Sequence, residues 1–141
     1  MNDENILERA MRLEGSELIS TMEDFYARIF SDPDHMPRYY SKSYIQSVNG
    51  SKTDYDAMIL AIGYMKEVIA SVKHTIIEAA AGPGIIAERH VVSMTLKDGR
   101  QASSEVYCFV KVKNGMIVAI DEVSYTLEGK DVIMSLMDIG E

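Results

Sequence analysis

The chain of 141 residues has a single cysteine, Cys108, so no disulfide can form within it. Its apolar runs fall well short of the roughly 20 residues that a membrane-spanning helix needs. Basic residues number 14 against 22 acidic ones, which gives a formal net charge of −8. Nucleic acids and anionic membranes bind positive protein surfaces, so we expect neither as a partner. The acidic start, Met1 to Glu4, is followed by no apolar signal segment, and we expect a cytoplasmic location.

The composition is that of one globular domain. Hydrophobic residues make up 47% and charged residues 26%, both ordinary values. There is no internal repeat, low-complexity segment or linker, and the length is enough to bury a core. We therefore expect a single domain over residues 1–141.

The N-terminal third shows helical periodicity. Apolar residues at steps of three and four predict a helix over residues 4–30, which Gly15 interrupts and in which Ser16 could cap a second segment. Asp32-Pro33 then has the form of an N-cap followed by proline, and it predicts a short helix to about Tyr40.

The middle of the chain alternates between strand and helix signals. Ser43 to Val48 is a strand candidate closed by the turn signal Asn49-Gly50. Thr53 with Asp56 resembles a capping box and opens a predicted helix over residues 54–71. The apolar stripe of that helix consists of Met58, Ile59, Ile62, Met65, Ile69 and Val72.

The C-terminal half predicts a meander of strands. A strand over residues 73–81 is followed by the Gly82-Pro83-Gly84 turn and by three long strands up to Tyr125. Residues 131–137 then form either a short helix or an ordered tail. Helices first and strands afterwards predict an α+β fold, in which helices pack on one face of a curved antiparallel sheet.

The two turns between the long strands decide which residues share a face. Lys97-Asp98-Gly99 and Lys113-Asn114-Gly115 each fit a three-residue loop, although Asn-Gly also fits a two-residue turn. A two-residue second turn would place Cys108 opposite Asp121, whereas a three-residue turn pairs Cys108 with Ile120 and Val106 with Glu122. We favour the three-residue turn because it gives a continuous apolar face.

In this register the inner face holds few polar side chains. His90 pairs with Val106 and Glu88 with Cys108, so His90 and Glu122 flank Val106 about 10 Å apart, which leaves room for a small molecule. The face comprises His90, Val92, Met94, Val106, Cys108, Val110, Val118, Ile120 and Glu122.

The opposite face gathers more large apolar groups than a sheet face in water usually does. We expect a second copy of the chain to cover it, which predicts a homodimer through the outer sheet face. That face comprises Tyr107, Phe109, Lys111, Ile117, Ala119, Val123 and Tyr125.

Nearly the whole chain resembles the nuclear transport factor 2-like superfamily, in its SnoaL-like and ketosteroid isomerase-like branch. The resemblance rests on Asp24-Phe25-Tyr26, on Tyr39-Tyr40 with Tyr44 to Gly50, and above all on the closing run from Cys108 to Glu122. It implies a cone-shaped fold, a strongly bent sheet around helices with a hydrophobic pocket between them, and commonly a dimer. Enzymatic members isomerise, cyclise or dehydrate small hydrophobic substrates without a cofactor, and other members only bind ligands or partners.

Carried over residue by residue, the resemblance is partial. The oxyanion hole of the ketosteroid isomerases consists of a tyrosine and a protonated aspartate that donates a hydrogen bond. Tyr26 approximately matches the tyrosine. Cys108 stands in the place of that aspartate, and the isomerase base falls near Asn49. Glu122 is similar to the acid on the last strand of SnoaL-type cyclases, although Ile120-Asp121 stands where that type has His-Trp.

The candidate catalytic residues are Glu122, a general acid or base with a pKa that burial would raise, and His90, a proton shuttle. Cys108 fits a small buried hydrophobe better than a nucleophile. The spacing of His35, His74 and His90 relative to Cys108 suggests no metal site, and we expect no metal and no cofactor. The candidate ligand-binding residues are Tyr26, Tyr40, Tyr44, Gln46, Met58, Ile62, Met65, Val106, Cys108, Val110 and Ile120.

Two functions remain open at this level. One is a SnoaL-like domain that binds a small hydrophobic ligand. The alternative is a cofactor-independent isomerase, cyclase or dehydratase that acts on a small hydrophobic carbonyl or polyketide-like substrate, with Glu122 as general acid or base.

Overall fold

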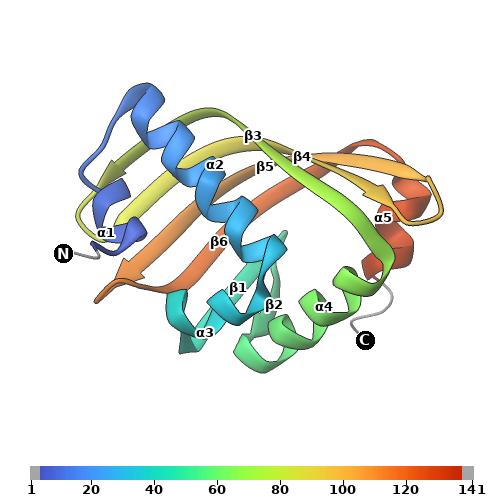
Figure 1. Ribbon diagram of the computed structural model, residues 1–141, viewed down its shortest axis with the longest axis horizontal. Helices are drawn as coiled ribbons and strands as arrows, with labels where there is room; N and C mark the ends of the chain where they lie inside the picture. Colours follow the sequence, from blue (N-terminus) through green and yellow to red (C-terminus); the bar gives the residue numbers. More distant parts are fainter. Residues whose placement is uncertain (1–3, 138–141) are drawn as a thin grey trace.

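The computed structural model describes residues 4–137 as one curved sheet with helices against its concave face (Figure 1). In chain order the elements are α1 (Ile6–Ala10), α2 (Gly15–Ser31), the 3-10 turn η1 (Pro33–His35), α3 (Met36–Tyr39), β1 (Tyr40–Val48), β2 (Ser51–Asp54), α4 (Tyr55–Val68), β3 (Ile69–Gly82), β4 (Ile85–Leu96), β5 (Gln101–Lys113), β6 (Met116–Glu128) and α5 (Lys130–Met137). The predicted α+β class and the helix over residues 131–137 are confirmed.

The sheet is mixed, and the prediction of a purely antiparallel sheet was wrong. The strand order is β2-β1-β6-β5-β4-β3, and β1 runs parallel to β6 while the other pairs are antiparallel. No hairpin joins β1 to β6, so no turn signal in the sequence reveals this pairing. The short strand β2 was also not predicted.

The N-terminal periodicity divides between two helices. Asn5 caps α1, because its side chain accepts hydrogen bonds from the backbone N–H groups of Leu7 and Glu8. The helix resumes at Gly15, whose φ of +59° suits glycine. The predicted break is present, but Glu14 rather than Ser16 holds the N-cap position of α2.

The helix predicted over residues 54–71 is shorter at its C-terminal end. Its cap is Asp54 rather than Thr53, because the Asp54 carboxylate accepts from the N–H of Ala57 at 3.0 Å. The helix ends at Val68, since Ile69 already pairs with Leu96 in the sheet. Ile69 and Val72 therefore belong to β3 and not to the apolar stripe of α4.

The first hairpin has the predicted register, with His90 opposite Val106 and Glu88 opposite Cys108. The second hairpin matches neither alternative. Its turn is the two-residue type, with Lys113 opposite Met116, and a register shift then follows between Lys111 and Val112.

The shift moves the pairing by one residue, which places Cys108 opposite Glu122 instead of Ile120 or Asp121. It restores the predicted faces for the strand beyond it, so Glu122 still points inward. Within the bulge the faces change: Ile117 is fully buried, and its assignment to the outer face was wrong, while Val118 has no strand partner opposite it.

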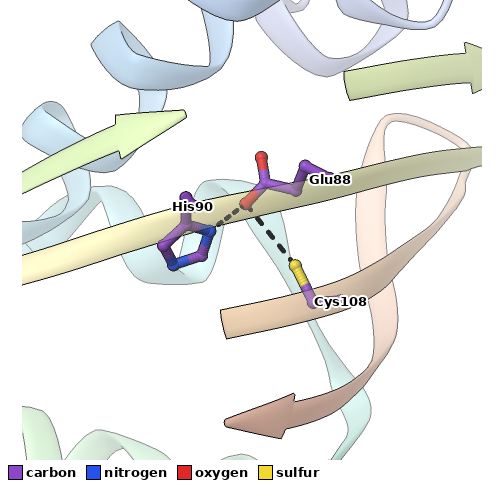
Figure 2. A group of neighbouring side chains, drawn as sticks. All are labelled: Glu88, His90 and Cys108. Atoms are coloured by element: carbon purple, nitrogen blue, oxygen red, sulfur yellow. Dashed lines mark hydrogen bonds and ion pairs between the residues drawn. The ribbon is translucent and has the colours of Figure 1, made fainter. Parts of the chain in front are cut away.

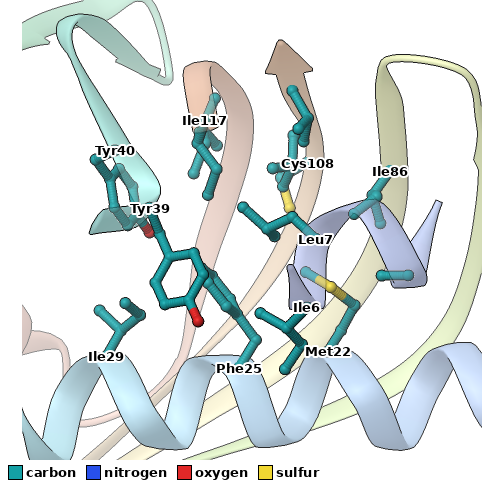
Figure 3. Packing of buried hydrophobic residues seen from close by; sticks show 14 of the residues in the cluster. Ile6, Leu7, Met22, Phe25, Ile29, Tyr39, Tyr40, Ile86, Cys108 and Ile117 are labelled. Carbon is teal, nitrogen blue, oxygen red and sulfur yellow. The ribbon is translucent and has the colours of Figure 1, made fainter. Parts of the chain in front are cut away.

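The core fills one end of the concave face. Phe25 and Met22 project from α2, and Leu7 from α1, towards sheet residues that include Ile86 and Ile117 (Figure 3). Beyond this core the inner face is less covered: Val92, Ser104 and Ser124 are only half-buried. The inner face is therefore covered more closely at the end where α1 and α2 pack than it is beyond them.

The connection between β6 and α5 provides a test of the packing. Gly129 has a φ of +75°, and a Cβ there would collide with the carbonyl oxygen of Gln101 and lie 2.9 Å from the Cα of Ala102. Gly99 has a φ of +91° with open space around it. Gly99→Ala should lower the free energy of unfolding by about 1–2 kcal/mol, because alanine disfavours a positive φ. Gly129→Ala should lower it by more, because the backbone of Gln101 and Ala102 would also have to move. Urea unfolding of both variants measures this, and equal losses would contradict it.

Candidate functional site

A buried polar cluster lies on the inner face where α2 crosses the sheet. Glu88 and His90 alternate on β4 and so share a face, and Cys108 on β5 is the cross-strand partner of Glu88. Nδ1 of His90 lies 2.5 Å from Oε1 of Glu88, and the Cys108 thiol donates to the same oxygen at 3.5 Å (Figure 2). The hydroxyl of Tyr26 on α2 donates to it at 2.9 Å. Three side chains therefore converge on one carboxylate oxygen.

Glu88 is the most constrained member of this cluster. Its carboxylate is fully buried, with 0% of the side chain exposed. Among residues 4–137, Oε2 has no hydrogen-bond partner. A buried acceptor left without a donor is costly, and such groups in native structures commonly mark a functional site.

Sequence reasoning missed Glu88 although the signal was present. The predicted pairing of Glu88 with Cys108, together with the two-residue step to His90, already placed its side chain on the inner face. The sequence pattern does not reveal that the Glu88 side chain is buried, because the burial comes from α2, which lies over this part of the sheet.

Aromatic rings surround the cluster. The His74 imidazole on β3 stacks on Tyr26, with ring centroids 4.6 Å apart, and lies 5.2 Å from the His90 ring. Burial, with His90 as a neighbour, lowers the pKa of His74 to about 4, so this ring is uncharged at neutral pH. Burial and the Glu88 carboxylate raise the pKa of Tyr26, which keeps its hydroxyl as a proton donor.

Glu122 belongs to a second hydrogen-bonded group beside the first. The Tyr44 hydroxyl donates to the Gln46 side-chain oxygen at 3.1 Å, and the Gln46 amide donates to Glu122 at 2.9 Å. Burial raises the pKa of Glu122, and the Gln46 hydrogen bond opposes that rise. Cys108 lies between Glu122 and Glu88 in the sheet, so the backbone positions of the two glutamates are two strand spacings, or about 10 Å, apart.

The predicted catalytic pair is placed differently from the expectation. Glu122 and His90 both face inward, but they do not flank Val106. The bulge sets Glu122 level with Glu88, and Val106 lies opposite Ser124. Glu122 accepts its side-chain hydrogen bond from Gln46.

The predicted ligand-binding residues divide by burial. Tyr44 and Val110 are buried in the core to 1% exposure or less, which leaves no surface for a ligand in this conformation. Also buried are Tyr40, Met58, Val106, Cys108 and Ile120. Tyr26, Gln46, Ile62 and Met65 are half-buried.

A hollow of about 560 Å³ lies between α3 and α4, away from the cluster. Met36, Tyr55, Ile59 and Ile62 are among its lining residues, which do not include Glu88, His90 or Glu122. On α4 only Met58 is buried, so most of the apolar stripe of this helix remains available to a ligand or to closer packing.

No protein-family model matches the sequence, and no curated protein does. Solved structures do match the fold. A nuclear transport factor 2-like protein of unknown function from Exiguobacterium sp. 255-15 has a TM-score of 0.61 at 16% identity, over 85% of this chain and 98% of that one. A protein with a ketosteroid isomerase-like fold from Catenulispora acidiphila, in complex with trimethylamine, has a TM-score of 0.59 at 12% identity, over 72% and 82%. This chain has the nuclear transport factor 2-like fold.

A third match is IdmH, a candidate polyketide cyclase from Streptomyces antibioticus, with a TM-score of 0.60 at 12% identity over 84% of this chain and 97% of that one. Identities this low establish the nuclear transport factor 2-like fold and leave the activity to the residues of the site. The family resemblance read from the sequence is confirmed at the level of fold. No helix in residues 4–137 is long and apolar enough to span a membrane.

The hydrogen bond from Tyr26 to Glu88 can be tested directly. Tyr26→Phe leaves the buried Glu88 carboxylate with one donor fewer, and we expect a loss of about 1–3 kcal/mol in the free energy of unfolding. Tyr64→Phe, on the half-buried side of α4, is the control for loss of a hydroxyl. Chemical denaturation of the single variants and of Tyr26→Phe combined with Glu88→Gln measures the coupling. Independent, additive losses would show that the bond contributes nothing to stability.

Proposed function

We propose that this protein binds a small, largely apolar molecule on the concave face of its sheet, with a polar group of the ligand directed at the Glu88–His90 pair. The observation that carries this proposal is the fully buried Glu88 carboxylate, whose Oε2 has no partner in the described part of the chain. A ligand hydroxyl or a protonated ligand group would satisfy that oxygen.

Apolar side chains next to the cluster provide the complementary wall. Val92 and Met94 continue the inner face of β4 beyond His90, and both are half-buried. Ligand sites typically combine such an apolar lining with a few fixed polar groups. Methionine side chains adapt to ligands of different shapes, which suits a pocket of this composition.

A second candidate function is catalysis without a cofactor, as an isomerase, cyclase or dehydratase of a small hydrophobic carbonyl or polyketide-like substrate. The position of Glu122 favours it, because burial raises the pKa of this carboxyl towards the range of a general acid or base. His90 would relay a proton or stabilise developing oxyanion charge.

A screen of small hydrophobic carbonyl compounds by thermal shift tests both functions. A binding compound should raise the melting temperature, and Glu88→Gln should reduce that rise, since the amide presents donors where the carboxylate only accepts. Glu17→Gln, an exposed residue on α2, is the matched control. Failure of every compound to bind the wild-type protein, or equal shifts in Glu88→Gln, would contradict the proposal.

Mass spectrometry of each bound compound then separates binding from catalysis. An isomerase or cyclase leaves the mass unchanged and alters the retention time, and a dehydratase removes one water. Glu122→Gln should abolish such conversion while binding persists. Recovery of the unaltered compound would leave ligand binding as the only function.

The outer face of the sheet supports a homodimer as part of the proposal. Tyr107, Phe109, Val123 and Tyr125 are 44%, 53%, 61% and 50% exposed on neighbouring strands. Beneath them the buried Glu105 accepts hydrogen bonds from Tyr107, Tyr125 and Arg89, which holds both tyrosine rings in place. A fixed, contiguous aromatic patch of this kind is typical of a protein interface.

Replacement of Phe109 tests this interface. Phe109→Glu should convert a dimer to a monomer, because it places an unpaired carboxylate in the centre of the apolar patch. Leu60→Glu makes a similar change at the 76%-exposed Leu60 on α4 and should leave the dimer intact. Analytical ultracentrifugation gives the mass of each species. A monomeric wild-type protein, or a dimer that survives Phe109→Glu, would exclude this interface.

A further inference from the structure

We propose that Glu88, His90 and Cys108 form a binding site for one zinc ion. Their potential ligand atoms, a carboxylate oxygen, an imidazole nitrogen and the sulfur, all lie within 4.8 Å of one another, and all three residues are buried. The three side chains come from adjacent positions on two paired strands, so the backbone holds them together (Figure 2).

The spacing is close to that of a metal centre. Zinc binds nitrogen and oxygen at about 2.0–2.2 Å and sulfur at about 2.3 Å, so the ligand atoms of a tetrahedral site are about 3.5 Å apart. Two distances between ligand atoms are already at or below this value. Nδ1 of His90 is 2.5 Å from Oε1 of Glu88, and Sγ of Cys108 is 3.5 Å from it. To admit the ion, the contact between Nδ1 of His90 and Oε1 of Glu88 would lengthen from 2.5 Å towards about 3.5 Å.

The charge of the site supports a divalent cation. Among the described residues, the only ion-pair partner of Glu88 is His90, and no lysine or arginine reaches the buried carboxylate. Zinc, one thiolate and one carboxylate sum to zero charge, so the buried centre would carry no net charge. On binding, Cys108 releases its thiol proton to solvent and His90 binds through the lone pair of Nδ1 with its proton on Nε2.

The ion would bind to Oε1 of Glu88, the oxygen that faces His90 and Cys108, whereas Oε2 points away from both side chains (Figure 2). Tyr26 supports the site from outside, since its hydroxyl donates to Glu88 Oε1 at 2.9 Å and would orient the carboxylate. Three protein ligands would leave one coordination position open to water or to a ligand atom. The inference departs from the expectation of no metal, and it holds whether or not the small-molecule proposal does.

Cobalt(II) is the probe for the experiment, because it replaces zinc and reports thiolate ligands by a charge-transfer absorption band in the near ultraviolet. The full-length protein is first freed of metal with a chelator. We expect a charge-transfer band that saturates at one equivalent of cobalt and disappears when zinc is added. No band in the folded wild-type protein would overturn the proposal.

Variants identify the ligands. Cys108→Ser should lose the band, and His90→Gln and Glu88→Gln should weaken binding at least about tenfold. His35→Gln, in the η1 turn away from the cluster, should bind as the wild type does. Circular dichroism establishes that each variant is folded. Tyr26→Phe keeps all three ligands and should weaken affinity about tenfold without loss of the band. A band that persists in Cys108→Ser, or binding that is unchanged in folded His90→Gln, would overturn the assignment.

Discussion

The register of β4, β5 and β6 is the constraint on which the site depends. It places Glu88, Cys108 and Glu122 in one row across three strands. Because side chains alternate along a strand, a shift of one residue would turn each of these groups to the outer face. The bulge between Lys111 and Val112 preserves the inward direction of Glu122 after a turn that alone would have reversed it.

Much of the fold was predictable because it depends on local signals. Turn residues such as Lys97-Asp98-Gly99 define the first hairpin, and its register follows from counting. The register of the second hairpin could not be found by counting residues from the turn. Asn114-Gly115 forms the tight turn, but no residue pattern indicates the bulge that follows it. It is favoured because it buries Ile117 while Ile120 and Glu122 keep the inner face. The parallel pairing of β1 with β6 depends on tertiary contacts and could not be predicted.

The candidate site was only partly predictable for a similar reason. His90, Cys108 and Glu122 were identified as the polar groups of the inner face, and all three lie there. Glu88 was placed correctly in the register but not recognised, because its importance comes from the cover of α2. The Tyr26 hydroxyl that reaches it is 62 positions away in the chain. Burial by a distant element is a property of the folded molecule and not of a pattern.

The packing of Glu88 is hard to reconcile with a purely structural role. A core position filled only for stability would hold an apolar residue, as Ile86 does one step earlier on the same face of β4. Glu88 instead buries a carboxylate on which three side chains converge at one oxygen, and it leaves the other oxygen without a partner in the described part of the chain. Stability alone does not favour that arrangement, because a buried polar network that is only partly satisfied is less stable than an apolar core. A ligand that donates to Oε2, or a cation held at Oε1, would bind this carboxylate, so the buried Glu88 is the common physical basis of both functional proposals.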